Sequence, residues 1–305
     1  MHPSRETRPR ALDPRLYQIA SLTGLLIYGI LGLDFEVTTA RVALLLTTVL
    51  LTQWICGKLW KLPAYDPRSA LISGLSLCLL MRTNSLVVAV ASAVIAIASK
   101  FLLRWKKKHL FNPTNIALVG LMLVTPQVWV SPGQWGNVAF FGFLMACVGG
   151  LVVNRAARSD VTFAFIGFYV GILLLRAQWL GQPLANPLHG LQNGAFLLFS
   201  FFMISDPRTT PDSRVGRILF ALLVAMGATF VQFVLYRTNG LLWSLALFSL
   251  AVPIIDRLLP GSRFEWRPVS PLPRLWKGRT HETLVDQPAL AFEPVARRAV
   301  AHHGP

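Results

Sequence analysis

The sequence predicts an all-α polytopic membrane protein, with about ten transmembrane helices arranged as two inverted five-helix repeats. Three observations lead to this fold class. Hydrophobic residues make up 54% of the 305 residues and charged residues only 14%, whereas soluble domains average about 25% charged residues. Apolar runs long enough to cross a hydrocarbon core of about 30 Å recur along the chain. The basic residues between these runs also follow a pattern typical of membrane topology.

The apolar runs define ten predicted spans. They are 16–33, 40–57, 69–81, 86–104, 112–129, 137–153, 161–180, 188–204, 216–236 and 240–258. The third is short, because its apolar core runs only from Ala70 to Met81 and contains Gly74. We expect it to be tilted, re-entrant or broken. The stretches 1–15 and 261–305 have no apolar periodicity and are predicted to be cytoplasmic tails.

The formal net charge of +16 follows the predicted topology. With the N-terminus in the cytoplasm, 25 of the 29 basic residues lie in inside segments, which agrees with the positive-inside rule and predicts two cytoplasmic termini. The four outside are Arg41, Arg82, Arg176 and Arg237. This distribution accounts for the charge without a nucleic-acid partner. The cluster 104–109 is interpreted as a topology anchor in contact with anionic lipid rather than a specific site.

Cysteines and histidines indicate no metal centre. Cys56, Cys78 and Cys147 all lie in apolar segments and none belongs to a CxxC pair, so we expect neither a disulfide framework nor a zinc site. An iron–sulfur cluster shared across a dimer stays open but has no support. A haem with two histidine ligands needs imidazoles at matched depth. Only His189 lies near a span interior, since His109 accompanies the basic cluster, and haem is therefore not expected.

Spacing indicates an internal repeat, with residues 16–130 as the first half and 137–259 as the second. Five spans per half give the halves opposite orientations, and membrane carriers often place their sites where such halves meet. Proline and glycine recur seven residues apart at the start of the third and eighth spans, and asparagine and proline fourteen apart across the fifth and tenth. The matching pairs are Pro67 and Gly74 with Pro187 and Gly194, and Asn112 and Pro126 with Asn239 and Pro253.

Polar, helix-breaking motifs at the span ends supply the candidate site. Backbone groups that lose their helical hydrogen bonds inside a membrane are found mainly where the chain lines a cavity. The candidate contacts for a cofactor or ion are Asn112, Asn115, His189, Asp206, Thr209 and Thr210, with Arg82 as the mirrored partner in the other half. Structural alternatives stay open for several of them. Asp206 followed by Pro207 also forms a generic turn, the threonines could cap the next helix, and His189 could simply bond a nearby carbonyl.

The motifs resemble the RnfD and NqrB family, the membrane subunits of Rnf and Nqr complexes, over roughly residues 15–260. The resemblance is carried by Phe111-Asn112-Pro113, Asn186-Pro187-Leu188-His189-Gly190, the run from Phe202 to Pro211, Gly216-Arg217-Ile218-Leu219-Phe220 and Ala251-Val252-Pro253-Ile254-Ile255-Asp256. It implies a ten-span, urea-transporter-like subunit of an ion-translocating electron-transport complex. It also implies partner redox subunits and a bacterial cytoplasmic membrane.

One departure limits the chemistry that this resemblance implies. Family members carry flavin mononucleotide (FMN) on a threonine in a Ser/Thr-Gly-Ala-Thr-like motif, and the stretch 114–186 has no such motif. Gly227-Ala228-Thr229 is similar but lies within the ninth span and is interpreted as a coincidence. Covalent FMN is therefore not expected. A non-covalent flavin (riboflavin or FMN), a quinone, or no cofactor remain open.

Three functions follow from these observations. The chain is predicted to be an electron-transport subunit that depends on partner subunits, and coupling to ion translocation stays open. The alternatives are a small-solute or ion transporter of the same fold, and a cofactor-free scaffold, since the shortened loops resemble a flavin-less branch that includes the enediyne-biosynthesis membrane protein UnbU. No set of nucleophile, base and orienting residue is visible, so an electron relay is the most that we expect of the chain as an enzyme.

Overall fold

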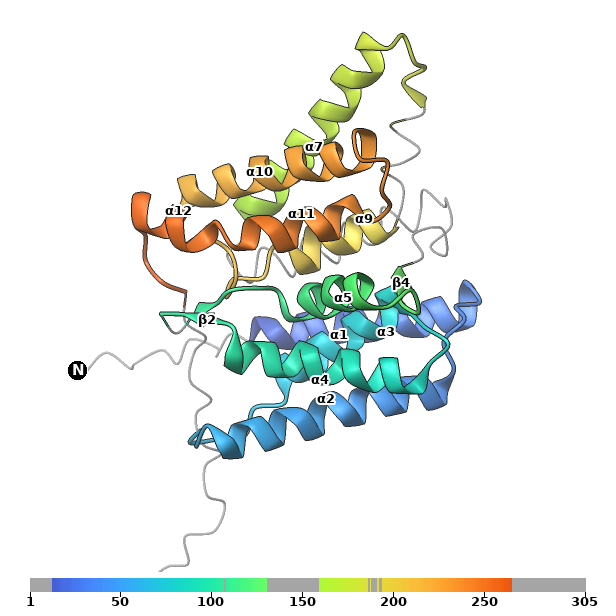
Figure 1. Ribbon diagram of the computed structural model, residues 1–305, viewed down its shortest axis with the longest axis vertical. Helices are drawn as coiled ribbons and strands as arrows, with labels where there is room; N and C mark the ends of the chain where they lie inside the picture. Colours follow the sequence, from blue (N-terminus) through green and yellow to red (C-terminus); the bar gives the residue numbers. More distant parts are fainter. Residues whose placement is uncertain are drawn as a thin grey trace, which may run out of the picture. The chain divides into compact units, whose positions relative to one another are not determined.

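The computed structural model describes residues 13–106, 108–130, 159–185, 187, 191 and 194–264, and these are mainly helical (Figure 1). The N-terminal half contains α1 (Pro14–Gly32), α2 (Thr39–Leu59), α3 (Arg68–Leu80), β1 (Met81–Arg82), α4 (Leu86–Leu102), β2 (Arg104–Trp105), β3 (Lys108–His109), α5 (Pro113–Val124) and β4 (Trp129–Val130). The C-terminal half contains α7 (Ser159–Trp179), α9 (Gly194–Leu198), the π-helix η2 (Phe199–Met203), α10 (Arg214–Phe233), α11 (Gly240–Ser249) and α12 (Val252–Leu258). The sixth predicted span, Cys147 and His189 lie outside the described residues.

The described helices confirm a helical membrane protein. Within these residues, α2, α7 and α10 are long and apolar enough to cross a bilayer, and α11 and α12 have this length and composition only as a pair bent by 51°, which fits a broken span or a re-entrant loop. Shorter apolar helices occupy the predicted third, fourth, fifth and eighth spans. The third span is short, as predicted, because α3 has only 13 residues. The count of ten spans and the inverted repeat stay predictions.

Local sequence signals set where several helices begin. The side chains of Asp13, Thr38, Ser85, Asn112 and Ser213 each accept a hydrogen bond from a backbone N–H in the first turn of the helix that follows. This capping satisfies amide groups that have no partner within the helix. Proline follows directly in α1 and α5, where its fixed backbone angle suits the first helical position.

Helix packing connects the two halves of the chain. In the first half α3 packs against α1 and α2, while α4 packs against α2 and α5. In the second half α10 packs against both α7 and α11. Helices α5 and α11 contact each other across the two halves and lie side by side in Figure 1. The start of α5 therefore lies at the contact between the halves.

A short β-ladder closes the broken ends of α3 and α5. Met81 pairs with Val130 and Arg82 pairs with Trp129, in antiparallel register. Both segments follow helices too short to span a bilayer, so their backbone groups cannot be satisfied by continuing the helix. Pairing the two segments gives those groups partners inside the protein, as an apolar surrounding requires.

Ion pairs hold together the starts of α1 and α3. Arg15 contacts Asp13 at 2.8 Å and Asp66 at 2.7 Å, while Arg68 contacts Asp13 at 2.6 Å and Asp66 at 2.9 Å. Each arginine thus bonds both carboxylates. The charges cancel locally, which permits their partial burial.

Replacing Gly240 by alanine is expected to destabilise the protein by about 1–3 kcal/mol. A Cβ at this position would lie 2.5 Å from the carbonyl oxygen of Ala228 in α10, a backbone atom that cannot rotate away. Gly120→Ala is the matched control, because a Cβ there meets no atom within 4 Å. Thermal unfolding of the detergent-purified protein, followed by circular dichroism, measures both. Equal transition temperatures for the two variants would contradict the close approach.

Acidification is expected to weaken the cluster at the starts of α1 and α3. Burial alone would raise the pKa of Asp66, but hydrogen bonds from Arg68 and the charge of Arg15 outweigh it and lower this pKa from 3.8 to about 2. A carboxyl group whose pKa is lower in the folded state contributes stability above its unfolded pKa, and this contribution is lost as the pH falls through the folded pKa.

The transition temperatures of the wild type and Asp66→Asn should therefore differ fully above about pH 5 and converge between about pH 4 and pH 2. Asp34→Asn is the control, since Asp34 is an exposed carboxylate. If the difference in transition temperature between the wild type and Asp66→Asn stayed constant over this pH range, the ionised Asp66 would not contribute to the acid sensitivity of the protein.

Candidate functional site

Two of the predicted motifs meet at one backbone carbonyl group. The side-chain oxygen of Asn112 caps α5 by accepting from the backbone N–H of Asn115 at 3.1 Å, and its Nδ2 donates to the carbonyl of Met203 at 3.3 Å. The backbone N–H of Asp206 donates to the same carbonyl at 3.4 Å. The end of the π-helix is thus bonded both to the Phe111-Asn112-Pro113 motif and to the turn that begins at Ser205.

The next residues of α5 reach two further helices. Thr114 Oγ1 donates to the carbonyl of Ser73 in α3 at 3.4 Å, and Asn115 Nδ2 donates to the carbonyl of Leu242 in α11 at 3.2 Å. Asn115 is fully buried, and its Oδ1 has no hydrogen-bond partner among the described residues. A buried acceptor without a partner costs about 1–3 kcal/mol. The start of α5 is therefore bonded to η2, α3 and α11, and it carries one buried acceptor that has no partner among the described residues.

Residues 205–211 form a compact turn stabilised by Asp206. Its carboxylate accepts from the backbone N–H of Arg208 at 3.0 Å, and its carbonyl accepts from the backbone N–H groups of Thr209 and Thr210, each at 3.1 Å. The hydroxyl of Thr209 donates to the same carbonyl at 3.3 Å. The generic turn considered for Asp206 is therefore present. Thr210 differs, because it is fully buried and its hydroxyl has no hydrogen-bond partner among the described residues.

Arg82 lies apart from these residues. Its Nη1 donates to the carbonyls of Met81 at 2.7 Å and Cys78 at 3.1 Å, and its guanidinium carbon lies 5.3 Å from the ring centroid of Phe35. It pairs with Trp129, beyond the C-terminal end of α5, whereas Asn112 precedes the first residue of α5. A helix of 12 residues separates these ends by about 18 Å. Arg82 and the Asn112 group therefore occupy opposite ends of α5.

A buried basic group that the sequence reasoning did not single out adjoins this turn. Lys100 is 4% exposed, and its Nζ donates to the carbonyl of Ser69 at 2.9 Å and to the Ser69 hydroxyl at 3.1 Å. Its charge interacts with those of Asp206 and Arg208. Burial, with the positive charges of Arg208, Lys100 and Arg104, lowers the pKa of nearby His109 to about 3. In the sequence, Lys100 could have been noticed as a lysine in the last turn of an apolar segment.

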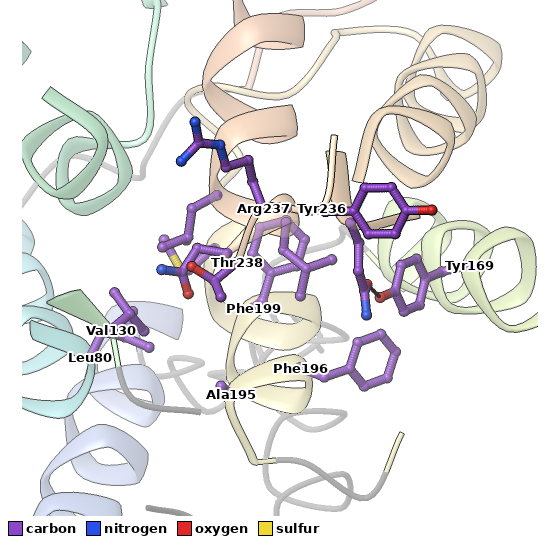
Figure 2. Close-up of a pocket in the computed structure, with 15 residues that line it drawn as sticks. Leu80, Val130, Tyr169, Ala195, Phe196, Phe199, Tyr236, Arg237 and Thr238 are labelled. Atoms are coloured by element: carbon purple, nitrogen blue, oxygen red, sulfur yellow. Dashed lines mark hydrogen bonds between the residues drawn. The ribbon is translucent and has the colours of Figure 1, made fainter. Parts of the chain in front are cut away.

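The second half provides most of a cavity of about 490 Å³ (Figure 2). Its wall is largely aromatic and aliphatic, and it also carries the amide of Gln232 and the polar segment 237–239. The hydroxyl of Tyr169 donates to Gln232 Oε1 at 3.0 Å. The lining residues are Leu80, Val130, Tyr169, Ala195, Phe196, Phe199, Met203, Gln232, Tyr236, Arg237, Thr238, Asn239, Gly240, Leu241 and Leu242.

None of the predicted contact residues that the structure describes lines the cavity, but two residues that bond to them do. Met203 and Leu242 line it, and their carbonyls accept from Asn112 and Asn115. The polar sequence Arg237-Thr238-Asn239 at a span end was the signal that could have drawn attention to it. The aromatic wall gave no such signal, because phenylalanines in a span equally fit lipid contact.

The cysteines and the Gly-Ala-Thr triplet considered from the sequence can be located among the described residues. In this part of the chain no group of three or more His, Cys, Asp or Glu side chains could hold a metal ion. Cys56 and Cys78 are free and buried. The hydroxyl of Thr229, in the Gly-Ala-Thr triplet, donates within α10 to the carbonyls of Ala225 at 3.0 Å and Met226 at 2.9 Å. Such bonding within the helix is ordinary for a buried threonine.

Comparison with known sequences agrees with the motifs. Residues 123–265 match the NQR2, RnfD, RnfE family. Similar proteins include the ion-translocating oxidoreductase complex subunit designated D of Erwinia tasmaniensis, 30% identical over 123 residues, or 40% of this chain and 34% of the relative. The protein of the same name from Alcanivorax borkumensis is 31% identical over 127 residues, or 40% and 35%. The match spans about a third of the length of each relative. Residues 123–265 of this chain are thus similar to the NQR2, RnfD, RnfE family, which confirms the predicted resemblance over that part; the Phe111-Asn112-Pro113 motif lies outside the matched residues.

Proposed function

We propose that this chain is an integral membrane subunit of an Rnf-type ion-translocating oxidoreductase complex. The observation that carries the proposal is the family match over residues 123–265. This segment contains the turn 205–211 and all but one of the residues that line the cavity. Its relatives are named as subunits of such complexes. Further membrane and redox subunits are therefore the proposed partners, and no observation favours the transporter or scaffold alternatives.

The proposed topology has about ten spans, two inverted halves of 16–130 and 137–259, and both termini in the cytoplasm of a bacterium. Support comes from the distribution of basic residues. The short α3, the π-helix and the bent pair of α11 and α12 add support, because transporter-type folds place discontinuous helices around a central site. Helices α3, η2 and α11 all bond to the start of α5.

A non-covalent flavin or a quinone is the proposed cofactor, with the cavity as its site. The cavity volume of about 490 Å³ falls within the range of about 300–1,000 Å³ common for ligand pockets. Phe196 and Phe199 offer aromatic faces, while Gln232 and Arg237 offer polar groups (Figure 2). A flavin or a quinone supplies reversible electron acceptance. The chain itself would orient the ring system and exclude lipid and water from it.

The polar residues around the start of α5 are proposed to bind the coupling ion or the cofactor. They bond to the carbonyl of Met203, a residue that also lines the cavity. Asn115 Oδ1 and Thr210 Oγ1 are buried polar atoms with no bonding partner among the described residues. Such atoms gain most from a polar ligand. We propose Asn112, Asn115, Asp206, Thr209 and Thr210 as this group. His189 and Arg82 are proposed as further contacts, with Arg82 acting at the other end of α5.

The purified protein is expected to carry a chromophore that acid releases. A flavin absorbance and fluorescence spectrum is measured in detergent, and again on the pellet and supernatant after acid precipitation. A non-covalent flavin appears in the supernatant, because no bond survives denaturation to hold it. Flavin retained in the pellet would contradict non-covalent attachment. A colourless protein with intact circular dichroism would instead favour a quinone, and solvent extraction with detection of the quinone decides that case. Neither chromophore nor quinone would contradict the cofactor proposal.

Substituting Asn112 separates its capping function from its bond to Met203. Asn112→Ala removes both and is expected to cost at least about 1 kcal/mol of stability. Asn112→Ser retains a cap, since serine is a good N-cap residue, but is too short to reach Met203. Both variants should lose cofactor or complex activity if the bond to Met203 holds the site. Thermal unfolding and cofactor content measure the two effects. Full cofactor content and activity in both variants would exclude Asn112 from the site.

A further inference from the structure

The helices α2 and α4 pack against each other, and their C-terminal ends lie at the same side of the bundle in Figure 1. The ring centroids of Trp60 and Phe101 lie 5.4 Å apart, and the guanidinium carbon of Arg104 lies 5.1 Å from the Phe101 ring centroid. One phenylalanine thus joins a tryptophan of one helix end to an arginine of the other. We call this the α2/α4 basic surface; it comprises Lys58, Trp60, Lys61, Phe101, Arg104, Trp105 and Lys106.

The basic residues of this surface have no acidic partners. Its four cations, all exposed, form no ion pair with the described residues. Several other basic residues of the same predicted membrane side are neutralised within the fold, whereas Arg214 and Arg257 also form no ion pair with the described residues. Arg15 and Arg68 bond Asp13 and Asp66, Lys108 bonds Asp212 and Asp256, and Arg217 bonds Asp160. The ends of α2 and α4 therefore bring four unpaired cations together on neighbouring helix ends.

Exposed apolar side chains directly adjoin these cations. Leu59 is 69% exposed and lies between Lys58 and Trp60, while Leu102 is 66% exposed and lies two residues before Arg104. Trp60 and Trp105 are 43% and 55% exposed. Tryptophan is enriched where a membrane protein meets the headgroup region. Both helix ends therefore expose a leucine, a tryptophan and two cations within a few residues of one another.

We propose that the α2/α4 basic surface binds the headgroup of an anionic phospholipid. The phosphate lies among Lys61, Arg104 and Lys106, and the acyl chains cover Leu59 and Leu102. Basic pockets between transmembrane helices are suited to anionic headgroups. A soluble acidic protein would satisfy the cations but would leave the leucines without a partner of matching chemistry. The lipid satisfies both parts of the surface.

The test compares lipid binding to two charge-matched variants of the full chain. Arg104→Gln/Lys106→Gln removes two cations of the surface, and Arg214→Gln/Arg257→Gln removes two exposed cations elsewhere. Native mass spectrometry of the detergent-purified proteins titrates phosphatidylglycerol, with phosphatidylcholine as the neutral probe. We expect the apparent Kd for phosphatidylglycerol to rise about tenfold in the first variant and less than about twofold in the second. Inorganic phosphate should leave the lipid bound.

Three results would overturn the proposal. They are equal weakening in both variants, equally tight binding of phosphatidylcholine by the wild type, and displacement of the lipid by inorganic phosphate alone. Circular dichroism checks that each variant is folded. Lys58→Gln/Lys61→Gln, on the other helix end, repeats the measurement if the first variant does not fold, and an unchanged Kd there would equally contradict the site. Flavin or quinone content should not change in these variants, so failure of this proposal is distinguishable from failure of the redox function.

Discussion

Every backbone polar group inside a bilayer needs a partner within the protein, and the arrangement of this chain follows from that requirement. Several of its apolar segments are too short or too bent to satisfy it as continuous helices. The ladder between β1 and β4 provides partners after α3 and α5. Side chains provide further partners: Asn112 bonds the carbonyl of Met203, Asn115 that of Leu242, and Thr162 that of Ser200. Each interruption is thereby tied to a neighbouring segment.

The same bonds join the two halves of the molecule. Asn112 and Asn115 belong to the first half, and their acceptors belong to η2 and α11 in the second. Lys108 adds ion pairs of 2.9 Å to Asp212 and 2.7 Å to Asp256. Because a π-helix displaces carbonyls from regular pairing, η2 can offer them to other elements. The contact between the halves thus consists of hydrogen bonds between interrupted helices and of the ion pairs that Lys108 makes with Asp212 and Asp256.

The cavity and the motif residues share the backbone around Met203 and Leu242. Their carbonyls bond the α5 asparagines, and the same residues line the cavity. Binding or release of a ligand in the cavity would therefore affect Met203 and Leu242, whose carbonyls fix the position of the start of α5. The proposed coupling of electron transfer to ion movement would require such an element, because coupling requires two sites that bias one shared element.

The sequence by itself determined the membrane class, the helix starts and the positions of the interruptions, because hydropathy, capping and proline act over a few residues. It also identified the Asn112 and Asp206 motifs, which depend on local patterns. Only the tertiary structure decided that these motifs share the Met203 carbonyl, since Asn112 and Met203 are 91 residues apart. It also separated Arg82 from them and brought Leu80 and Val130 to the cavity of the second half. Such contacts depend on packing between distant segments, which no local pattern in the sequence specifies.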